Sequence, residues 1–132
     1  SNPQYRHLDL RLESSNGSLS LPGNATTLNQ LFLNLLLNAC HAQPEQGRID
    51  VRAHIDEEAG MAVVNVEDRG PGISAEIMDR LFEPFSSTRG STGLGLAICH
   101  GIVGEHGGRI RAENRRDGGA RFIVELPLER ET

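Results

Sequence analysis

The chain has 132 residues, which is enough for one domain with a substantial core, and we predict a single domain over residues 1–132 with a tail or linker at residues 1–6. Its formal net charge of −5 and its lack of a basic run argue against a nucleic-acid-binding surface. Cys40 and Cys99 lie in apolar helical patterns, which indicates buried thiols rather than a disulfide framework. No apolar run approaches the roughly 18 residues of a membrane span. We therefore expect a cytoplasmic domain and leave open a membrane-anchored parent protein.

The first part of the chain is predicted to form a strand followed by a long helix. Leucines alternate with polar residues over 5–13, a pattern typical of a half-buried strand, and this strand is expected to pair with residues 18–21. The helix is predicted to run from Asn24, a favourable N-cap, to Gln43, with a proline and a glycine ending it.

Six further elements follow: strands over 48–55 and 61–68, helices over 74–82 and 92–107, and strands over 108–115 and 120–128. Ser74 is expected to cap the first of these helices, and short turns join the strands of each pair. The order predicts an α+β fold, a two-layer α/β sandwich in which about three helices cover one face of a mixed, mainly antiparallel sheet.

The long helix is apolar over most of its circumference, so we expect it to be buried on nearly all sides. A narrow polar stripe crosses it at Gln30, Asn34, Asn38 and His41, with spacings of four, four and three residues. Neutral amides in such a helix indicate a pocket wall that meets hydrogen bonds or a hard cation beside an anionic ligand. The alternative is that the asparagines bind neighbouring backbone.

Two glycine-containing stretches have both a structural and a functional interpretation. Asp68 follows a predicted buried strand and precedes Gly70 and Gly72, which is also typical of a surface turn. Gly93 and Gly95 lie at the start of the last helix, where unpaired amides favour an anion, although glycines often serve packing. The polar stretch 86–91 before this helix is predicted to be a mobile flap, from which Arg89 could reach a terminal phosphate.

Four ordered motifs, "NQLFLNLLLNA", "EDRGPGI", "LFEPF" and "GSTGLGLAI", resemble the N, D-x-G-x-G, F and second glycine boxes of a known family. The chain from about Leu8 to Leu128 is similar to the ATP-binding catalytic domain of sensor histidine kinases. This family belongs to the GHKL superfamily, which has the Bergerat ATP-binding fold and also holds type II topoisomerases, mismatch-repair ATPases and a heat-shock chaperone. The resemblance implies an ATP site with Mg²⁺ as a second cofactor.

The resemblance also implies roles for individual residues. Asp68 would accept a hydrogen bond from the exocyclic amine of adenine and so reject guanine, Gly70 and Gly72 would let the backbone pass against the ring, and Ile73 would be its apolar neighbour. The remaining implied nucleotide contacts are Asn34, Asn38, His41, Arg89, Thr92, Gly93, Leu94, Gly95 and Leu96.

Three positions bear on the metal and the phosphates. Asn38 would give its side-chain oxygen to Mg²⁺. His41 stands where many relatives have a lysine, which makes a phosphate contact weaker and pH-dependent. Ala120 stands where a threonine is frequent, so a hydroxyl contact is absent.

The implied catalytic residues are Asn34, Asn38 and Arg89. Relatives that hydrolyse ATP place a glutamate where this chain has Asn34, and an amide cannot act as their general base. A neutral imidazole needs no strong base, so the expected reaction is transfer of the γ-phosphoryl group to a histidine.

Further partners follow from the resemblance. The acceptor histidine would lie on a dimerisation domain of the same parent protein, and a response regulator receiver domain would act downstream. The isolated domain is expected to be a monomer and the parent a homodimer. The alternatives are a clamp-type ATPase and a catalytically degenerate nucleotide-binding module.

Overall fold

The computed structural model describes residues 9–14, 23–42, 47–84 and 94–128. In chain order the elements are β1 (Asp9–Ser14), α1 (Ala25–His41), β2 (Arg48–Asp56), β3 (Met61–Glu67), α2 (Ala75–Met78), α3 (Gly95–Glu105), β4 (Arg109–Asn114) and β5 (Ala120–Pro127). Each predicted element with described residues is present. The helix expected over 74–82 is shorter, however, since only the four residues of α2 are helical, with Ser74 as its N-cap. No helix in these four ranges is both long and apolar enough to cross a membrane.

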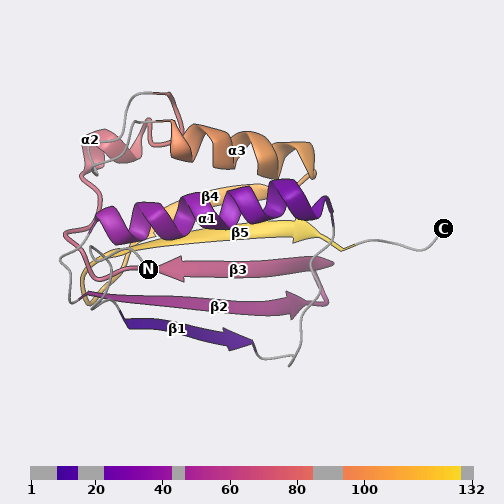
Figure 1. Ribbon diagram of the computed structural model, residues 1–132, viewed down its shortest axis with the longest axis horizontal. Coiled ribbons are helices and arrows are strands. Elements are labelled where there is room, and N and C mark those ends of the chain that lie inside the picture. The colour runs from indigo at the N-terminus through magenta and orange to yellow at the C-terminus, as the bar shows by residue number, and fades with distance from the viewer. Residues whose placement is uncertain (1–8, 15–22, 43–46, 85–93, 129–132) are drawn as a thin grey trace.

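The strands form one five-stranded sheet in the order β1-β2-β3-β5-β4, and the helices lie over one of its faces (Figure 1). Strands β2, β3, β5 and β4 pair antiparallel, whereas the edge strand β1 runs parallel to β2. The predicted two-layer fold with a mixed, mainly antiparallel sheet is therefore confirmed. The hairpin partner expected for the first strand, residues 18–21, lies outside the described residues.

Helix α1 begins as the sequence predicts and is only partly buried. The side chain of Asn24 accepts the backbone amides of Thr26 at 2.9 Å and Thr27 at 3.2 Å, which is the usual N-cap arrangement. Leu31 and Leu35 are fully buried against the sheet, but Leu33 is 56% exposed. Among the described residues, the expectation that this helix is buried on nearly all sides is therefore wrong, because the face that carries Leu31 and Leu35 packs against the core whereas Leu33 lies on another face.

The core lies between the helices and the inner face of the sheet. Residues alternate along β2, β3 and β5, so that Ile49, Val64, Val66, Phe122 and Val124 join the buried cluster under the helices. The residues between them in the sequence point to the opposite, outer face. This alternation places charged side chains of four strands together on the side that no described helix covers.

A histidine joins the two long helices at the end of α3. The Nε2 atom of His106 accepts the backbone amide of Asn24 at 3.2 Å, and its Nδ1 atom lies 2.8 Å from the carbonyl oxygen of Ile102. A Cβ atom at Gly23 would lie 2.2 Å from the ring, so the chain approaches this imidazole closely. Accepting through Nε2 requires the neutral tautomer that carries its hydrogen on Nδ1.

Candidate nucleotide-binding site

The described site residues belong to elements whose ends meet at one end of the molecule. Figure 1 shows the C-terminal end of α1, the end of β3, the start of β5 and the N-terminal end of α3 on the same side. Contacts join several of these parts, since the loop after β3 packs against Ala42 and hydrogen-bonds to Ala120. The topology therefore brings together residues that are far apart in the sequence.

Asp68, directly after β3, is 1% exposed and is held by backbone amides. Its Oδ1 atom accepts the N–H of Gly70 at 3.0 Å and the N–H of Ala120 at 3.1 Å. The main chain of Asp68 also donates to the carbonyl oxygen of Ala120 at 2.9 Å. Two amides on one oxygen fix the orientation of the carboxylate, and its burial distinguishes it from an acid in a surface turn.

The glycines around Asp68 allow close contacts within the protein. A Cβ atom at Gly70 would lie 2.2 Å from the carbonyl oxygen of Ala42, and one at Gly72, which has a φ of +83°, would lie 2.8 Å from Oδ1 of Asn114. At Gly119, with a φ of +89°, a Cβ atom would lie 2.0 Å from the carbonyl oxygen of Asp68. Gly70 and Gly72 thus allow close contacts with the end of α1 and with β4. The resemblance implies that these glycines let the backbone pass against the adenine ring, but it does not predict the contacts within the protein.

Asn114 is a structural residue of the site that sequence reasoning missed. Its Oδ1 atom accepts the N–H of Ile73 at 2.7 Å, and its Nδ2 donates to the carbonyl oxygen of Ile73 at 2.8 Å. This paired contact fixes the loop to the end of β4, and Ile73 itself is buried. The only signal in the sequence was an asparagine at the end of a predicted strand, which does not identify a partner 41 residues away.

The polar stripe of α1 divides into a buried and an exposed part. Gln30 and His41 are exposed, whereas Asn38 is 5% exposed and Asn34 is half-buried. Within the described part of the chain, neither polar atom of the Asn38 side chain has a hydrogen-bond partner, nor has Nδ2 of Asn34. The alternative in which Asn38 binds neighbouring backbone through its side chain is therefore not supported, and its amide is available to a ligand.

The donor set fits a metal that arrives with phosphates. Within the described residues, no three His, Cys, Asp or Glu side chains gather as a metal site. Mg²⁺ commonly binds through one or two protein oxygens together with phosphates and waters. The Oδ1 atom of Asn38, buried and without a described partner, is suitable as such a ligand.

The start of α3 is suited to an anion. Leu94 is its N-cap residue and makes no side-chain capping hydrogen bond, and the first turn contains no acidic residue. A Cβ atom at Gly95 would meet nothing described within 4 Å, while Leu96 is buried in the core. The predicted contacts Arg89, Thr92 and Gly93, and the predicted flap at 86–91, lie outside the described residues.

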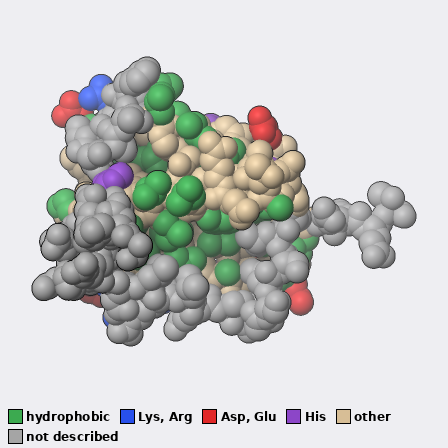
Figure 2. Space-filling model, in the orientation of Figure 1, with side chains coloured by type: hydrophobic (Ala, Val, Ile, Leu, Met, Phe, Trp, Pro, Cys, Tyr) green, Lys and Arg blue, Asp and Glu red, His purple; other side chains and the backbone are tan. Residues whose placement is uncertain are grey.

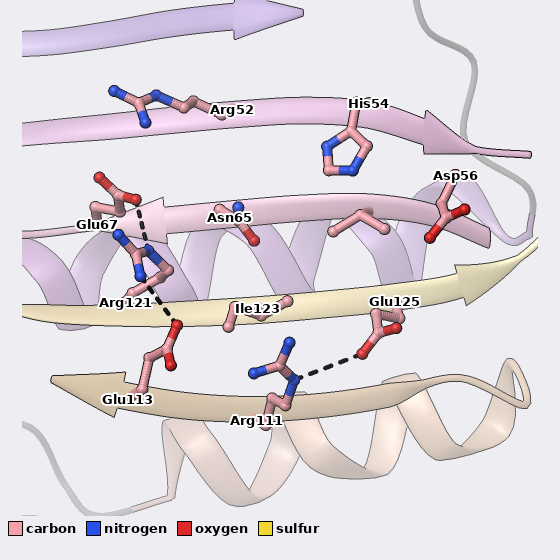
Figure 3. A pocket seen from close by; sticks show the side chains of 11 residues that line it. Arg52, His54, Asp56, Asn65, Glu67, Arg111, Glu113, Arg121, Ile123 and Glu125 are labelled. Carbon is pink, nitrogen blue, oxygen red and sulfur yellow. Dashed lines mark hydrogen bonds and ion pairs between the residues drawn. The ribbon is translucent and has the colours of Figure 1, made fainter. Parts of the chain in front are cut away.

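The two faces of the sheet differ in charge. Figure 2 shows the helix side, where hydrophobic and uncharged side chains fill the centre of the view and charged ones lie at its margins. A hollow of about 380 Å³ lies on the outer face, away from the helices (Figure 3). Charged side chains of β2, β3, β5 and β4 line it, and Asp68 and Asn38 do not. This hollow is therefore not the predicted nucleotide site.

Comparison with known proteins supports the motifs. Over 125 residues the chain is 38% identical to the sensor histidine kinase ZraS of Escherichia coli O157:H7, covering 93% of this chain and 27% of ZraS. It therefore spans about a quarter of the length of that relative. The catalytic domain of histidine kinase ThkA, in a nucleotide-free form, superposes with a TM-score of 0.82 at 36% identity, covering 95% of this chain and 82% of that one.

Two further structures come from larger assemblies. Full-length ShkA in complex with AMPPNP has a TM-score of 0.81 at 28% identity, covering 94% of this chain and 26% of ShkA. ThkA in complex with the response regulator TrrA has a TM-score of 0.79 at 35% identity, covering 92% of this chain and 34% of ThkA. Residues 23–130 match the family described as histidine kinase-, DNA gyrase B-, and HSP90-like ATPase. With sensor histidine kinases among its relatives and histidine kinase catalytic domains among its structural neighbours, the chain belongs to this ATPase family.

Proposed function

We propose that this chain is the catalytic domain of a sensor histidine kinase, which binds Mg²⁺-ATP and provides the γ-phosphoryl group for transfer to a histidine. The observation that carries the proposal is the pairing of an oriented, buried acid with a buried amide that has no described partner. Asp68, directly after β3, is aligned by two backbone amides, and Asn38, near the C-terminal end of α1, has no described partner for either of its polar atoms. Figure 1 shows these ends of β3 and α1 on the same side of the molecule.

Asp68 selects the base. Two backbone amides, those of Gly70 and Ala120, bind Oδ1 of Asp68. We assign the hydrogen bond from the exocyclic amine of adenine to Oδ2 of the same carboxylate. Guanine presents a carbonyl oxygen at that position, and two acceptors cannot share a hydrogen bond. The cost of leaving such buried acceptors unpaired makes ATP the preferred nucleotide.

Asn38 is the protein ligand of Mg²⁺, and the start of α3 receives phosphate oxygens. Bound Mg²⁺ neutralises charge on the phosphates during phosphoryl transfer. Gly95 leaves room for an anion beside the first amides of α3. Asn34, His41, Arg89, Thr92 and Gly93 complete the proposed phosphate side.

Histidine is the proposed acceptor because the chain lacks a glutamate at the position of Asn34. Water would require a general base there, whereas imidazole is nucleophilic when neutral. The structures of ShkA with AMPPNP and of ThkA with TrrA support nucleotide binding and a response regulator as partner. We assign the reaction to the cytoplasm, with the acceptor on a dimerisation domain of the same parent protein.

The test uses γ-labelled ATP. None of the five histidines, His7, His41, His54, His100 and His106, precedes an acidic residue, a feature of the family's acceptor sites. We therefore expect the chain alone to bind ATP without acquiring stoichiometric acid-labile label. Adding the dimerisation domain of the parent should place label on that domain, slowly, because the effective concentration given by the tether is lost.

Two outcomes would contradict the proposal. Stoichiometric phosphohistidine on the chain alone would show that the acceptor is misassigned. Steady release of phosphate from ATP without any acceptor would favour the ATPase alternative, and Asn38→Ala serves as the control that should abolish Mg²⁺-dependent label in the complete mixture.

A further inference from the structure

The residues on either side of Asp68 take part in ion pairs on the outer face of the sheet. The strand register places Asp50, Glu67, Arg121 and Glu113 in one row across β2, β3, β5 and β4. Glu67 precedes Asp68 in the sequence and Arg69 follows it, so the backbone that carries Asp68 is flanked by two charged side chains. Figure 3 shows part of this row, with Arg121 between Glu67 and Glu113.

Arg69 connects the loop to β2. Its guanidinium donates to Oδ2 of Asp50 at 2.8 Å, and Arg48 donates to the same carboxylate at 3.0 to 3.2 Å. Asp50 is 4% exposed. Burial alone would raise the pKa of this carboxyl, but hydrogen bonds from the two arginines lower the pKa below its usual value overall.

Glu67 connects the end of β3 to the turn between β4 and β5. Its Oε2 lies 2.7 Å from Nε of Arg121, and its Oε1 lies 3.5 Å from Nε of Arg115. Arg115 in turn donates to the carbonyl oxygen of Gly118 at 2.6 Å. Glu67 is 2% exposed, so this carboxylate is a buried charge with cationic partners on two sides.

Each ion pair lies next to one of the two amides that hold the Asp68 carboxylate. Gly70, whose N–H donates to Oδ1, directly follows Arg69. Ala120, whose N–H also donates to Oδ1, directly precedes Arg121 at the end of the turn that Arg115 holds. Each donor is therefore next in the chain to a residue whose side chain is held on the opposite face of the sheet.

We propose that Arg69 and Glu67 are positioning residues for base recognition, acting through the amides of Gly70 and Ala120 on the orientation of Asp68. This inference rests on the proposed role of Asp68 as the acceptor for adenine. Neither residue touches the nucleotide in this scheme. They set the preference for adenine from the outer face of the sheet.

The first test variant is Arg69→Met. Asp50 keeps its two-point contact with Arg48 in this variant, so no buried carboxylate loses all of its partners and the protein should fold. The matched control is Arg111→Met, which removes an arginine from the same face, 3.7 Å from Glu125 and away from Asp68. Urea unfolding without nucleotide measures the stability of both variants.

Calorimetry then compares ATP with a purine riboside triphosphate that lacks the exocyclic amine. We expect Arg69→Met to weaken ATP binding about tenfold and to change binding of the analogue less than about twofold, because only ATP uses the aligned acceptor. A general loss of structure would weaken both ligands alike. Arg69→Lys should retain part of the preference for ATP over the analogue. Glu67→Gln should reduce this preference, and Arg111→Met should leave it at the wild-type value.

Amide hydrogen exchange without nucleotide gives an independent measurement. We expect the amide of Gly70 to exchange faster in Arg69→Met, and that of Ala120 to exchange faster in Glu67→Gln. Unchanged preference together with unchanged exchange in the folded variants would overturn the inference. A wild-type protein without preference for ATP over the analogue would instead overturn the proposed role of Asp68, and the exchange rates would still decide whether Arg69 and Glu67 position the loop.

Discussion

Replacing Asp68 by asparagine separates its contribution to folding from its contribution to binding. In the folded protein, Oδ1 accepts two backbone amides, from Gly70 and Ala120. Asparagine can keep both hydrogen bonds only by placing its oxygen there. Its NH₂ group must then occupy the position of the other carboxylate oxygen, which the proposal assigns to adenine.

The magnitudes follow from this geometry. In two hydrogen bonds the acceptor changes from a charged carboxylate oxygen to a neutral amide oxygen. This change should lower the free energy of unfolding by about 1 to 2 kcal/mol, and the protein should remain folded. At the ligand, a donor now faces the amine of adenine, itself a donor. Losing that hydrogen bond and leaving both donors unpaired should cost about 2 to 3 kcal/mol, or roughly 30- to 150-fold in affinity for ATP.

Calorimetry at pH 7, with the fold checked by circular dichroism, measures the effect. The control is Glu125→Gln, which makes the same chemical change in a carboxylate on the outer face and should leave the affinity within about twofold. A folded Asp68→Asn protein that binds ATP as tightly as the wild type would refute the assignment of Asp68 to the base.

Three further predictions concern other buried groups. Asn38→Leu should raise the free energy of unfolding without nucleotide by about 1 kcal/mol, because it removes a buried amide without described partners. The same variant should abolish the Mg²⁺ dependence of ATP binding. A lower free energy of unfolding in urea would contradict this prediction. Cys99, whose pKa burial raises to about 12, should be roughly one part in ten thousand thiolate at pH 8 and should alkylate far more slowly in the native than in the denatured protein, as followed by mass spectrometry. Asp50→Asn should cost about 1 to 2 kcal/mol in urea unfolding at pH 7. Because the pKa of Asp50 is lower in the folded protein than its ordinary value near 3.9, this stabilisation is fully present above that value and is lost as the pH falls through the pKa of the folded protein. The free energies of unfolding of the two proteins should therefore converge below pH 4. A difference that stays constant with pH would exclude this origin.

The secondary structure was largely predictable because local chemistry determines it. The strands β3 and β5 and the cap at Asn24 appear in the structure as the sequence predicts. The parallel pairing of β1 with β2 was not predicted, because a crossover through α1 is not encoded near either strand. The length of α2 was overestimated, since after Met78 the chain continues in turns that the same apolar pattern also fits.

Burial of the candidate residues was predictable where single residues have a distinctive chemistry, and their roles stay predictions. An acid after a buried strand and amides on an apolar helix, together with the resemblance to sensor histidine kinases, indicated Asp68 and Asn38, and the structure shows that both are buried. The residues that hold the site together were not predictable. Asn114 acts through a contact 41 residues away, and the row containing Glu67 and Arg121 depends on strand register. Neither long-range pairing nor register follows from local pattern.

The link between His106 and Asn24 has a mechanical consequence for the helix layer. It joins the C-terminal end of α3 to the N-terminal end of α1, which is the end opposite the candidate site (Figure 1). The helices are also joined along their length, where Sγ of Cys99 donates to the carbonyl oxygen of Leu31 at 3.6 Å, so the histidine contact extends this packing to the ends of both helices. The imidazole therefore ties the first turn of α1 to the last turn of α3, at the end of the helix layer that lies farthest from the candidate site.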